Sequence, residues 1–142
     1  MIAPTPAQLK AFLEQFPASD YATDPDDAFD ALRRRTQFNV IDYATMWKVD
    51  LILRQYTPFD ASRFARCSIV DIAGVRLQTA SAEDILITKL WWAKLGESER
   101  QINDAAGILQ VQHSSLDMEY VERWVAVLDL DEQWRATLVR AG

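Results

Sequence analysis

The feature that most constrains the fold is a change of apolar period in the middle of the chain. In residues 46–53 apolar and polar side chains alternate, which is typical of a strand with one covered face. Residues 39–43 form the predicted antiparallel partner across a short turn. A second hairpin is predicted over residues 67–80, with Ala73 and Gly74 at its turn. Four strands are therefore expected in a small antiparallel or mixed sheet.

Helix-start signals lie on both sides of these strands. The dipeptides Thr5-Pro6 and Asp24-Pro25 each join a capping residue to a proline, which is typical of the first turn of a helix. A third helix is expected from Ser81 to Gly96, and apolar residues at helical spacing continue to the C-terminus. Residues 54–66 are expected to form a loop between the two hairpins.

Composition indicates one α+β domain. A chain of 142 residues is long enough to bury a core, and its single cysteine cannot form an internal disulfide. No apolar run approaches the ~18 residues of a membrane span, and no secretory signal opens the chain, so a cytoplasmic protein is expected. The net charge of −6 does not favour nucleic acid as a partner. The domain is expected to have three parts: helical residues 1–36, β-hairpins in 37–80 and helical residues 81–142.

The chain offers little for histidine or cysteine chemistry. Its single histidine, His113, lies between two predicted helices and is expected on a surface loop. Cys67 has no second cysteine nearby, which favours a packing role over a nucleophile. No glycine-rich phosphate loop is present.

Carboxylates are the remaining candidates for chemistry. Asp50 lies in the middle of a predicted strand, where aspartate is disfavoured, and Lys48 shares its face. One interpretation is a solvated face with a weak surface ion pair. The other is that Asp50 faces a cleft and holds a divalent cation or orients a nucleophile, because Mg²⁺ prefers carboxylate oxygens on a rigid element.

Lys89 poses a similar choice on the third helix. It projects from the edge of the apolar stripe of that helix. Its ammonium group either extends to water or reaches a carboxylate, for which Asp104 and Asp50 are the candidates. Arg100 is also spaced for an intrahelical pair with Asp104.

Three stretches follow one another in an informative order: FNVIDYATMWKVDLIL, GVRLQTASAEDILITKLWWAK and SERQINDAAGILQVQ. In this order they resemble parts of the small nucleotidyltransferase-fold proteins related to the AbiEii-type toxins, over about residues 25–140. The resemblance implies a partial nucleotidyltransferase fold. In that family a strand of the KVD type brings a third carboxylate beside a metal-binding pair, and Asp50 matches it. Lys48 matches the basic position before it, with a phosphate-binding role.

The resemblance also implies supporting residues in the helical part. The stretch AEDILITKL matches the helix that packs next to the family's site, with Glu83, Asp84 and Lys89 at recurrent polar positions. Asp104 matches an acid in the following helix that supports the site.

Two defining motifs of the family, a Gly-Ser turn and an Asp-x-Asp pair, are not found in residues 1–37. Two-metal nucleotidyl transfer needs closely placed carboxylates, and one aspartate cannot hold both ions. The chain is therefore expected to be truncated, degenerate, or completed by another polypeptide. If active, it would transfer a nucleoside monophosphate from a nucleoside triphosphate with Mg²⁺, and Asp50 would be the catalytic residue, as a metal ligand or as the general base.

The alternative is a noncatalytic binding or regulatory module, such as a partner in a toxin–antitoxin-like pair. Both interpretations predict association, because a sheet that lacks its first strands leaves an open edge and an uncovered apolar face. The expected partners are a second copy in a two-fold homodimer or a completing chain, with a nucleotide as the small ligand.

Overall fold

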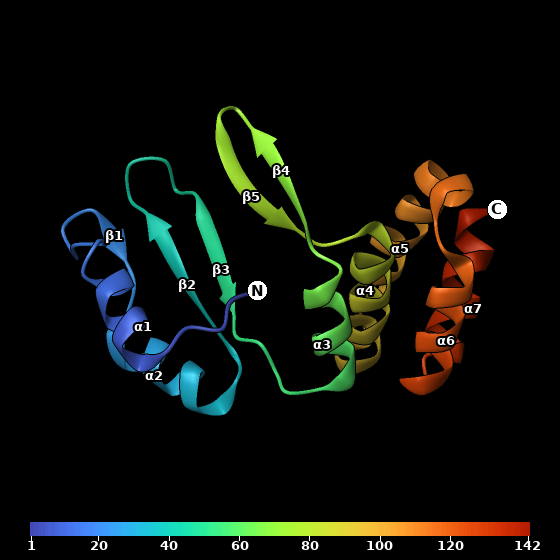
Figure 1. Cartoon of the computed structure of the whole chain (residues 1–142), viewed down its shortest axis with the longest axis horizontal. Helices are drawn as coiled ribbons and strands as arrows, with labels where there is room; N and C mark the ends of the chain where they lie inside the picture. The colour runs from blue at the N-terminus through green and yellow to red at the C-terminus, as the bar shows by residue number, and fades with distance from the viewer. The chain divides into compact units, whose positions relative to one another are not determined.

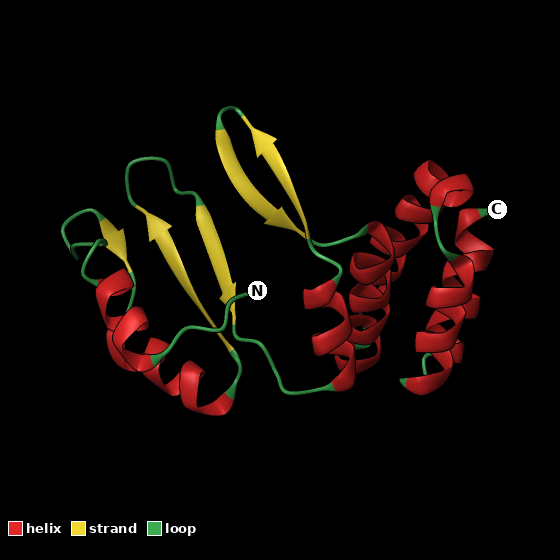
Figure 2. Cartoon of the chain, viewed as in Figure 1, coloured by secondary structure: helices red, strands yellow, loops and turns green.

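The computed structural model describes residues 1–142, apart from the side chain of His113. The protein is α+β as predicted, with seven α-helices and two small antiparallel sheets along the described chain (Figure 1). The chain divides into two compact units, Met1–Asp60 and Ala61–Gly142. This division differs from the predicted parts, whose boundaries fell after residues 36 and 80. Each unit contains its own sheet and helices (Figure 2).

The first unit packs two helices against one face of a three-stranded antiparallel sheet. The strand order is β1-β2-β3, so β3 is an edge strand. The predicted partner of the 46–53 run is confirmed, although the paired residues begin and end slightly differently. The elements are α1 (Pro6–Leu13), β1 (Tyr21–Ala22), α2 (Pro25–Arg34), β2 (Gln37–Asp42) and β3 (Lys48–Ile52).

Both predicted helix starts in this unit are confirmed by their caps. The Thr5 hydroxyl accepts the backbone N–H of Gln8, and the Gln8 side chain accepts the backbone N–H of Thr5, which completes a capping box. Asp24 caps α2 by accepting the N–H of Asp26 at 2.8 Å. Helix α2 ends where Arg35 adopts a left-handed conformation with φ of 56°.

The core of the first unit covers only one end of β3. Phe38 and Val40 of β2 are buried with apolar side chains from α1 and α2. Leu53, just after β3, is fully buried, whereas Val49 is 54% and Trp47 is 75% exposed. The predicted apolar face of this strand is therefore covered at its C-terminal end and open at its N-terminal end.

The second unit consists of a β-hairpin and a group of packed helices. Its first helix, α3, replaces the loop predicted for residues 54–66 and contains the boundary between the units. Along the described chain no helix is long and apolar enough to cross a membrane. The elements are α3 (Pro58–Ala65), β4 (Ser68–Ile72), β5 (Val75–Thr79), α4 (Ala82–Gly96), α5 (Glu99–Gln112), a 3₁₀ turn η1 (His113–Ser115), α6 (Met118–Val127) and α7 (Asp131–Ala141).

The hairpin β4–β5 confirms the predicted turn. Ala73 and Gly74 have positive φ values of 53° and 83°, as a two-residue type I′ turn requires. The Asp71 carboxylate accepts the N–H of Gly74 at 2.8 Å and holds the turn closed. All four predicted strands are present, but they lie in two separate sheets and not in one, and β1 is additional.

Helix α4 is the central helix of the second unit. It packs against α5, α6 and α7, and its Leu86, Ile87 and Leu90 are fully buried. The helix starts at Ser81 as predicted, since the Ser81 hydroxyl accepts the N–H of Asp84. It ends at Gly96, but Glu97, not the glycine, adopts the left-handed conformation.

Candidate functional site

Asp50 lies on the open face of the first sheet. The β2–β3 register puts Asn39 directly across from it, and neighbouring strand residues on one face have their Cβ atoms about 5 Å apart. The Lys48 ammonium lies 3.1 Å from the Asp50 carboxylate. The Asp50 side chain is 49% exposed, so the carboxylate points to solvent and not into the cleft that one interpretation required. The surface ion pair of the solvated-face interpretation is therefore present, and the exposed carboxylate is accessible to a cation from solvent.

The open face offers a limited set of cation ligands. Among the described residues no group of three or more His, Cys, Asp and Glu side chains is arranged to hold a metal ion. Asp50 supplies one carboxylate, and the strand register puts Asn39, whose amide oxygen is a neutral donor, directly across from it. Mg²⁺ is commonly held by one or two carboxylates together with substrate phosphates. This donor set fits a single Mg²⁺ shared with a nucleotide, and it does not fit a two-metal centre.

The predicted supporting residues belong to the second unit and lie in two separate groups. Lys89 of α4 donates to Asp104 of α5 at 2.7 Å, which is one of the two partners the sequence suggests for it. The Lys89 hydrogen bond and charge hold the pKa of the Asp104 carboxyl below its usual value. Asp84 has different partners: Arg66 directly after α3, Ser81 at the start of α4, and Tyr120 of α6.

Asp84 is the most deeply buried predicted site residue, with 1% of its surface exposed. The Tyr120 hydroxyl donates to one carboxylate oxygen at 2.7 Å, and the Ser81 hydroxyl donates to the other at 2.8 Å. The Arg66 guanidinium lies 3.4 Å from that second oxygen and stacks 3.9 Å above the Tyr120 ring. Burial raises the pKa of the Tyr120 hydroxyl, and its bond to Asp84 adds to this effect. Asp84 of α4 therefore joins Tyr120 of α6 and Arg66, the residue that directly follows α3.

Glu83 extends the same network. Arg66 donates to one of its oxygens at 3.1 Å, and the backbone N–H of Asp117 donates to the other at 3.0 Å. Burial raises the pKa of the Glu83 carboxyl, but these donors outweigh burial and the pKa lies below its ordinary value. The sequence analysis missed Arg66 because it lies in the segment read as a loop. Helical spacing of Phe59, Ser62 and Arg66 was the available signal.

The contribution of this network to stability can be tested by measuring how the effect of Glu83→Gln on the free energy of unfolding depends on pH. Because the folded-state pKa lies below the ordinary value of 4.5, the carboxylate stabilises the fold above that pH. The stabilisation is lost as the pH falls through the lowered pKa. Glu83→Gln is expected to cost about 1–3 kcal/mol of unfolding free energy at about pH 6, and less near about pH 3. Urea titrations at both pH values measure this, and an equal cost at both would contradict it.

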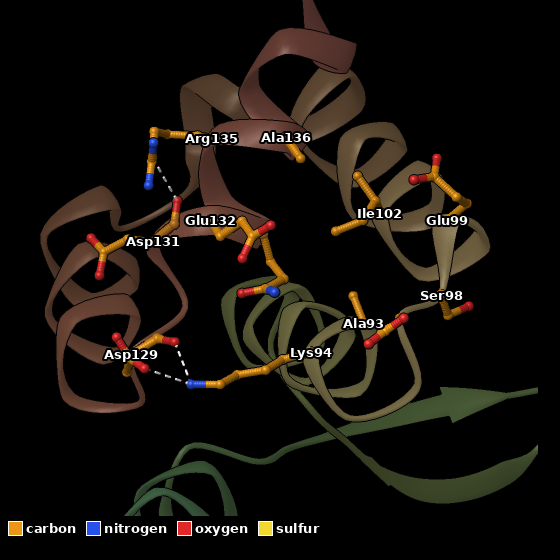
Figure 3. Close-up of a pocket in the computed structure, with 12 residues that line it drawn as sticks. Ala93, Lys94, Ser98, Glu99, Ile102, Asp129, Asp131, Glu132, Arg135 and Ala136 are labelled. Carbon is orange, nitrogen blue, oxygen red and sulfur yellow. Dashed lines mark hydrogen bonds and ion pairs between the residues drawn. The ribbon is translucent and has the colours of Figure 1, made fainter.

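A hollow of about 660 Å³ lies among the ends of α4, α5 and α7 (Figure 3). Lys94 donates to the backbone and side chain of Asp129, which lowers the pKa of that carboxyl. The other charged side chains around the hollow are mostly acidic. This lining disfavours a phosphate-bearing ligand, so the hollow gives no support for nucleotide binding. The charged residues are Lys94, Glu97, Glu99, Asp129, Asp131, Glu132 and Arg135.

Cys67 is half-buried between α3 and β4, where its thiol donates to the backbone oxygen of Arg63 at 3.3 Å. This environment fits the predicted packing role. The prediction of a surface histidine at His113 concerns a side chain outside the described part of the structure; its backbone lies in η1.

Comparisons with protein-family models, with curated proteins and with solved structures find no match to this chain. Fold and geometry therefore define the class no further than a two-unit α+β protein with an exposed carboxylate on an edge strand.

Proposed function

We propose that this chain is a nucleotidyltransferase-like module that contributes Asp50 and Lys48 to a Mg²⁺–nucleotide site which it does not complete alone. The observation that carries the proposal is the position of Asp50. The carboxylate is held in the middle of a hydrogen-bonded strand, on the uncovered face of a sheet whose other face is packed. A rigid, accessible carboxylate beside an ammonium group is suited to bind a metal-bound polyphosphate.

Each residue has a separate role in this proposal. When bound, Mg²⁺ would neutralise phosphate charge and orient the nucleotide. Asp50 would supply its carboxylate ligand, and Lys48 would exchange its bond to Asp50 for the phosphate oxygens. In a completed site an acceptor hydroxyl gives its proton to a carboxylate base while its oxygen attacks the α-phosphorus. The bond from that phosphorus to the bridging oxygen breaks, and pyrophosphate leaves with the electron pair of that bond. The remaining carboxylates of the site would come from other residues. The reaction would take place in the cytoplasm, where nucleoside triphosphates are available.

A noncatalytic binding module is the second candidate, and exposed apolar side chains favour it. Met46 and Trp47 at the open end of the first sheet are largely exposed. Ile72 and Val75 form a cross-strand pair on the hairpin and are also exposed. Exposed apolar groups of this kind are common at protein interfaces. Such a module would act through a protein partner and would need no nucleotide.

Isothermal titration with ATP and with GTP, each with Mg²⁺, tests the first candidate. We expect Asp50→Asn to weaken Mg²⁺-dependent binding at least about tenfold, because a ligand charge worth about 1.4 kcal/mol or more is removed. Glu122→Gln removes an exposed carboxylate from α6 and is the matched control. Binding that is absent, or equal in the wild type and Asp50→Asn, would instead favour the binding module.

A further inference from the structure

The outer edge of β3 presents unpaired backbone groups beside Asp50. Across the β2–β3 ladder the N–H of Leu53 donates to the carbonyl of Thr36 at 2.9 Å. Hydrogen-bonded and non-hydrogen-bonded pairs alternate in an antiparallel ladder, so the odd-numbered residues of β3 bond to β2. The N–H and C=O groups of Lys48 and Asp50 therefore point outward, away from the sheet.

The same edge already accepts a segment of chain just beyond these residues. The Ile2 N–H donates to the Ile52 carbonyl at 2.8 Å, and the Arg54 N–H donates to the Ile2 carbonyl at 2.8 Å. Together they form a parallel bridge between Ile2 and Leu53. This edge of the first sheet therefore already pairs with one extended segment, and the stretch from Lys48 to Asp50 continues the same edge with its backbone groups outward.

We propose that a second copy of this chain pairs with β3 at this edge, antiparallel, with the two-fold axis beside Val49. In this register Lys48 lies opposite Asp50 of the second copy, and Asp50 lies opposite its Lys48. Both residues point their backbone groups outward, so each of the two opposed pairs exchanges two backbone hydrogen bonds. A two-fold interface is self-complementary, as closed dimers require.

Charge complementarity sets this register apart from its neighbours. Within one chain Lys48 and Asp50 form a single exposed ion pair at 3.1 Å. In the dimer each finds an opposite charge directly across the strand pair, the arrangement in which unlike charges stabilise a sheet. A two-fold register centred on Asp50 would instead oppose the two aspartates, which is unfavourable.

Apolar side chains on the other face of β3 support the same register. Val49 would meet its own copy across the axis, and Trp47 would lie opposite Leu51 of the second copy. Val49 and Trp47 are the exposed residues that the core of the first unit leaves uncovered. The second copy would cover them without any change in the strand.

The hairpin edges lack this complementarity. Because a two-residue turn joins β4 and β5, Ile72 and Val75 form a hydrogen-bonded pair, and Ile69 and Asp71 point outward from β4. A two-fold pairing of β4 would oppose Ile69 and Asp71. The corresponding pairing of β5 would oppose Arg76 and Gln78. Neither combination joins opposite charges, so β3 is the edge best suited to a second copy.

The inference goes beyond the proposed function, since the dimer needs no Mg²⁺ and no nucleotide. It has one consequence for that function. Both Asp50 carboxylates would lie on one face, as diagonal neighbours whose Cα atoms are about 7–8 Å apart. A chain that binds no nucleotide would contradict the proposed function but not the proposed dimer. A chain that stays monomeric would contradict the dimer but not the proposed nucleotide binding.

Light scattering on the full chain at several concentrations tests the proposal. We expect a mass of twice 16.2 kDa for the wild type, with weaker association at high salt. Lys48→Asp and Asp50→Lys each replace both intermolecular ion pairs by like charges, so each variant alone should raise the dimer Kd at least about tenfold. Glu122→Lys changes the charge of α6 and should leave the mass unchanged.

Mixing the two variants gives the decisive result. A chain with Lys48→Asp and a chain with Asp50→Lys restore opposite charges across the axis, so they should form a mixed dimer that neither forms alone. If a reversal lowers the far-UV circular dichroism signal, Lys48→Gln replaces it and should weaken the dimer and its salt dependence. A wild-type monomer at about 100 μM, or variants that dimerise like the wild type, would overturn the proposal.

Discussion

Replacing Asp84 by alanine is expected to lower the free energy of unfolding of the second unit by about 3–5 kcal/mol. The carboxylate is buried and accepts hydrogen bonds from Tyr120 and Ser81. Its removal leaves the Tyr120 hydroxyl without this acceptor and the Arg66 charge without one of its two carboxylate partners. Removing this buried carboxylate costs more than its bonds contribute, because the Tyr120 donor loses its acceptor inside the core and Arg66, 32% exposed, loses part of its charge compensation.

Urea titration followed by tryptophan fluorescence measures this cost, since four of the five tryptophans lie in the second unit. Asp104→Ala is the matched control. Asp104 also pairs with a cation, Lys89, but this pair is only half-buried, so its loss is expected to cost less than the loss of the buried Asp84. Should Asp84→Ala unfold like the wild type yet lose Mg²⁺-dependent nucleotide binding, Asp84 would be a site residue and not a structural one.

Local signals account for the parts of the fold that the sequence predicted. A capping residue before proline marked the starts of α1 and α2, and the Ala73-Gly74 turn marked the hairpin. The same signal occurs at Thr57-Pro58, where the Thr57 hydroxyl accepts the N–H of Asp60 at 3.0 Å and α3 begins. The position of this segment between two predicted hairpins favours a connecting loop and hides the helix-start signal.

Other features had no local signal. Strand β1 contains two residues, too few for any alternation of apolar side chains. The left-handed residue after α4 is Glu97, although glycine is the usual choice and Gly96 precedes it.

The contacts of the candidate site also differ in whether the sequence can predict them. Lys48 and Asp50 are two residues apart in one strand, so their pairing followed from strand geometry. The partners of Asp84 are 18 and 36 residues away in the chain, at Arg66 and Tyr120. Spacing cannot reveal such contacts, because they depend on how α3 and α6 pack against α4. The burial of Asp84 was likewise invisible in the sequence.

The second large effect on stability is expected in helix α4, which contains one buried and one exposed leucine. Leu90 is 0% exposed and Leu95 is 68% exposed, within the same helix. Leu90→Ala is expected to cost about 2–5 kcal/mol, because the lost contacts and the remaining cavity both destabilise a close-packed core. Leu95→Ala is expected to stay within about 0.5 kcal/mol, as is usual for surface positions.

The pair is informative because both substitutions remove the same atoms and introduce the same residue into one helix. Differences in helix propensity and in the unfolded chain therefore largely cancel, and the remaining difference reports burial. Thermal and urea unfolding of both variants measure it. A large loss for Leu95→Ala would mean that another surface covers this side of α4 in solution. A small loss for Leu90→Ala would contradict the position of α4 at the centre of the second unit.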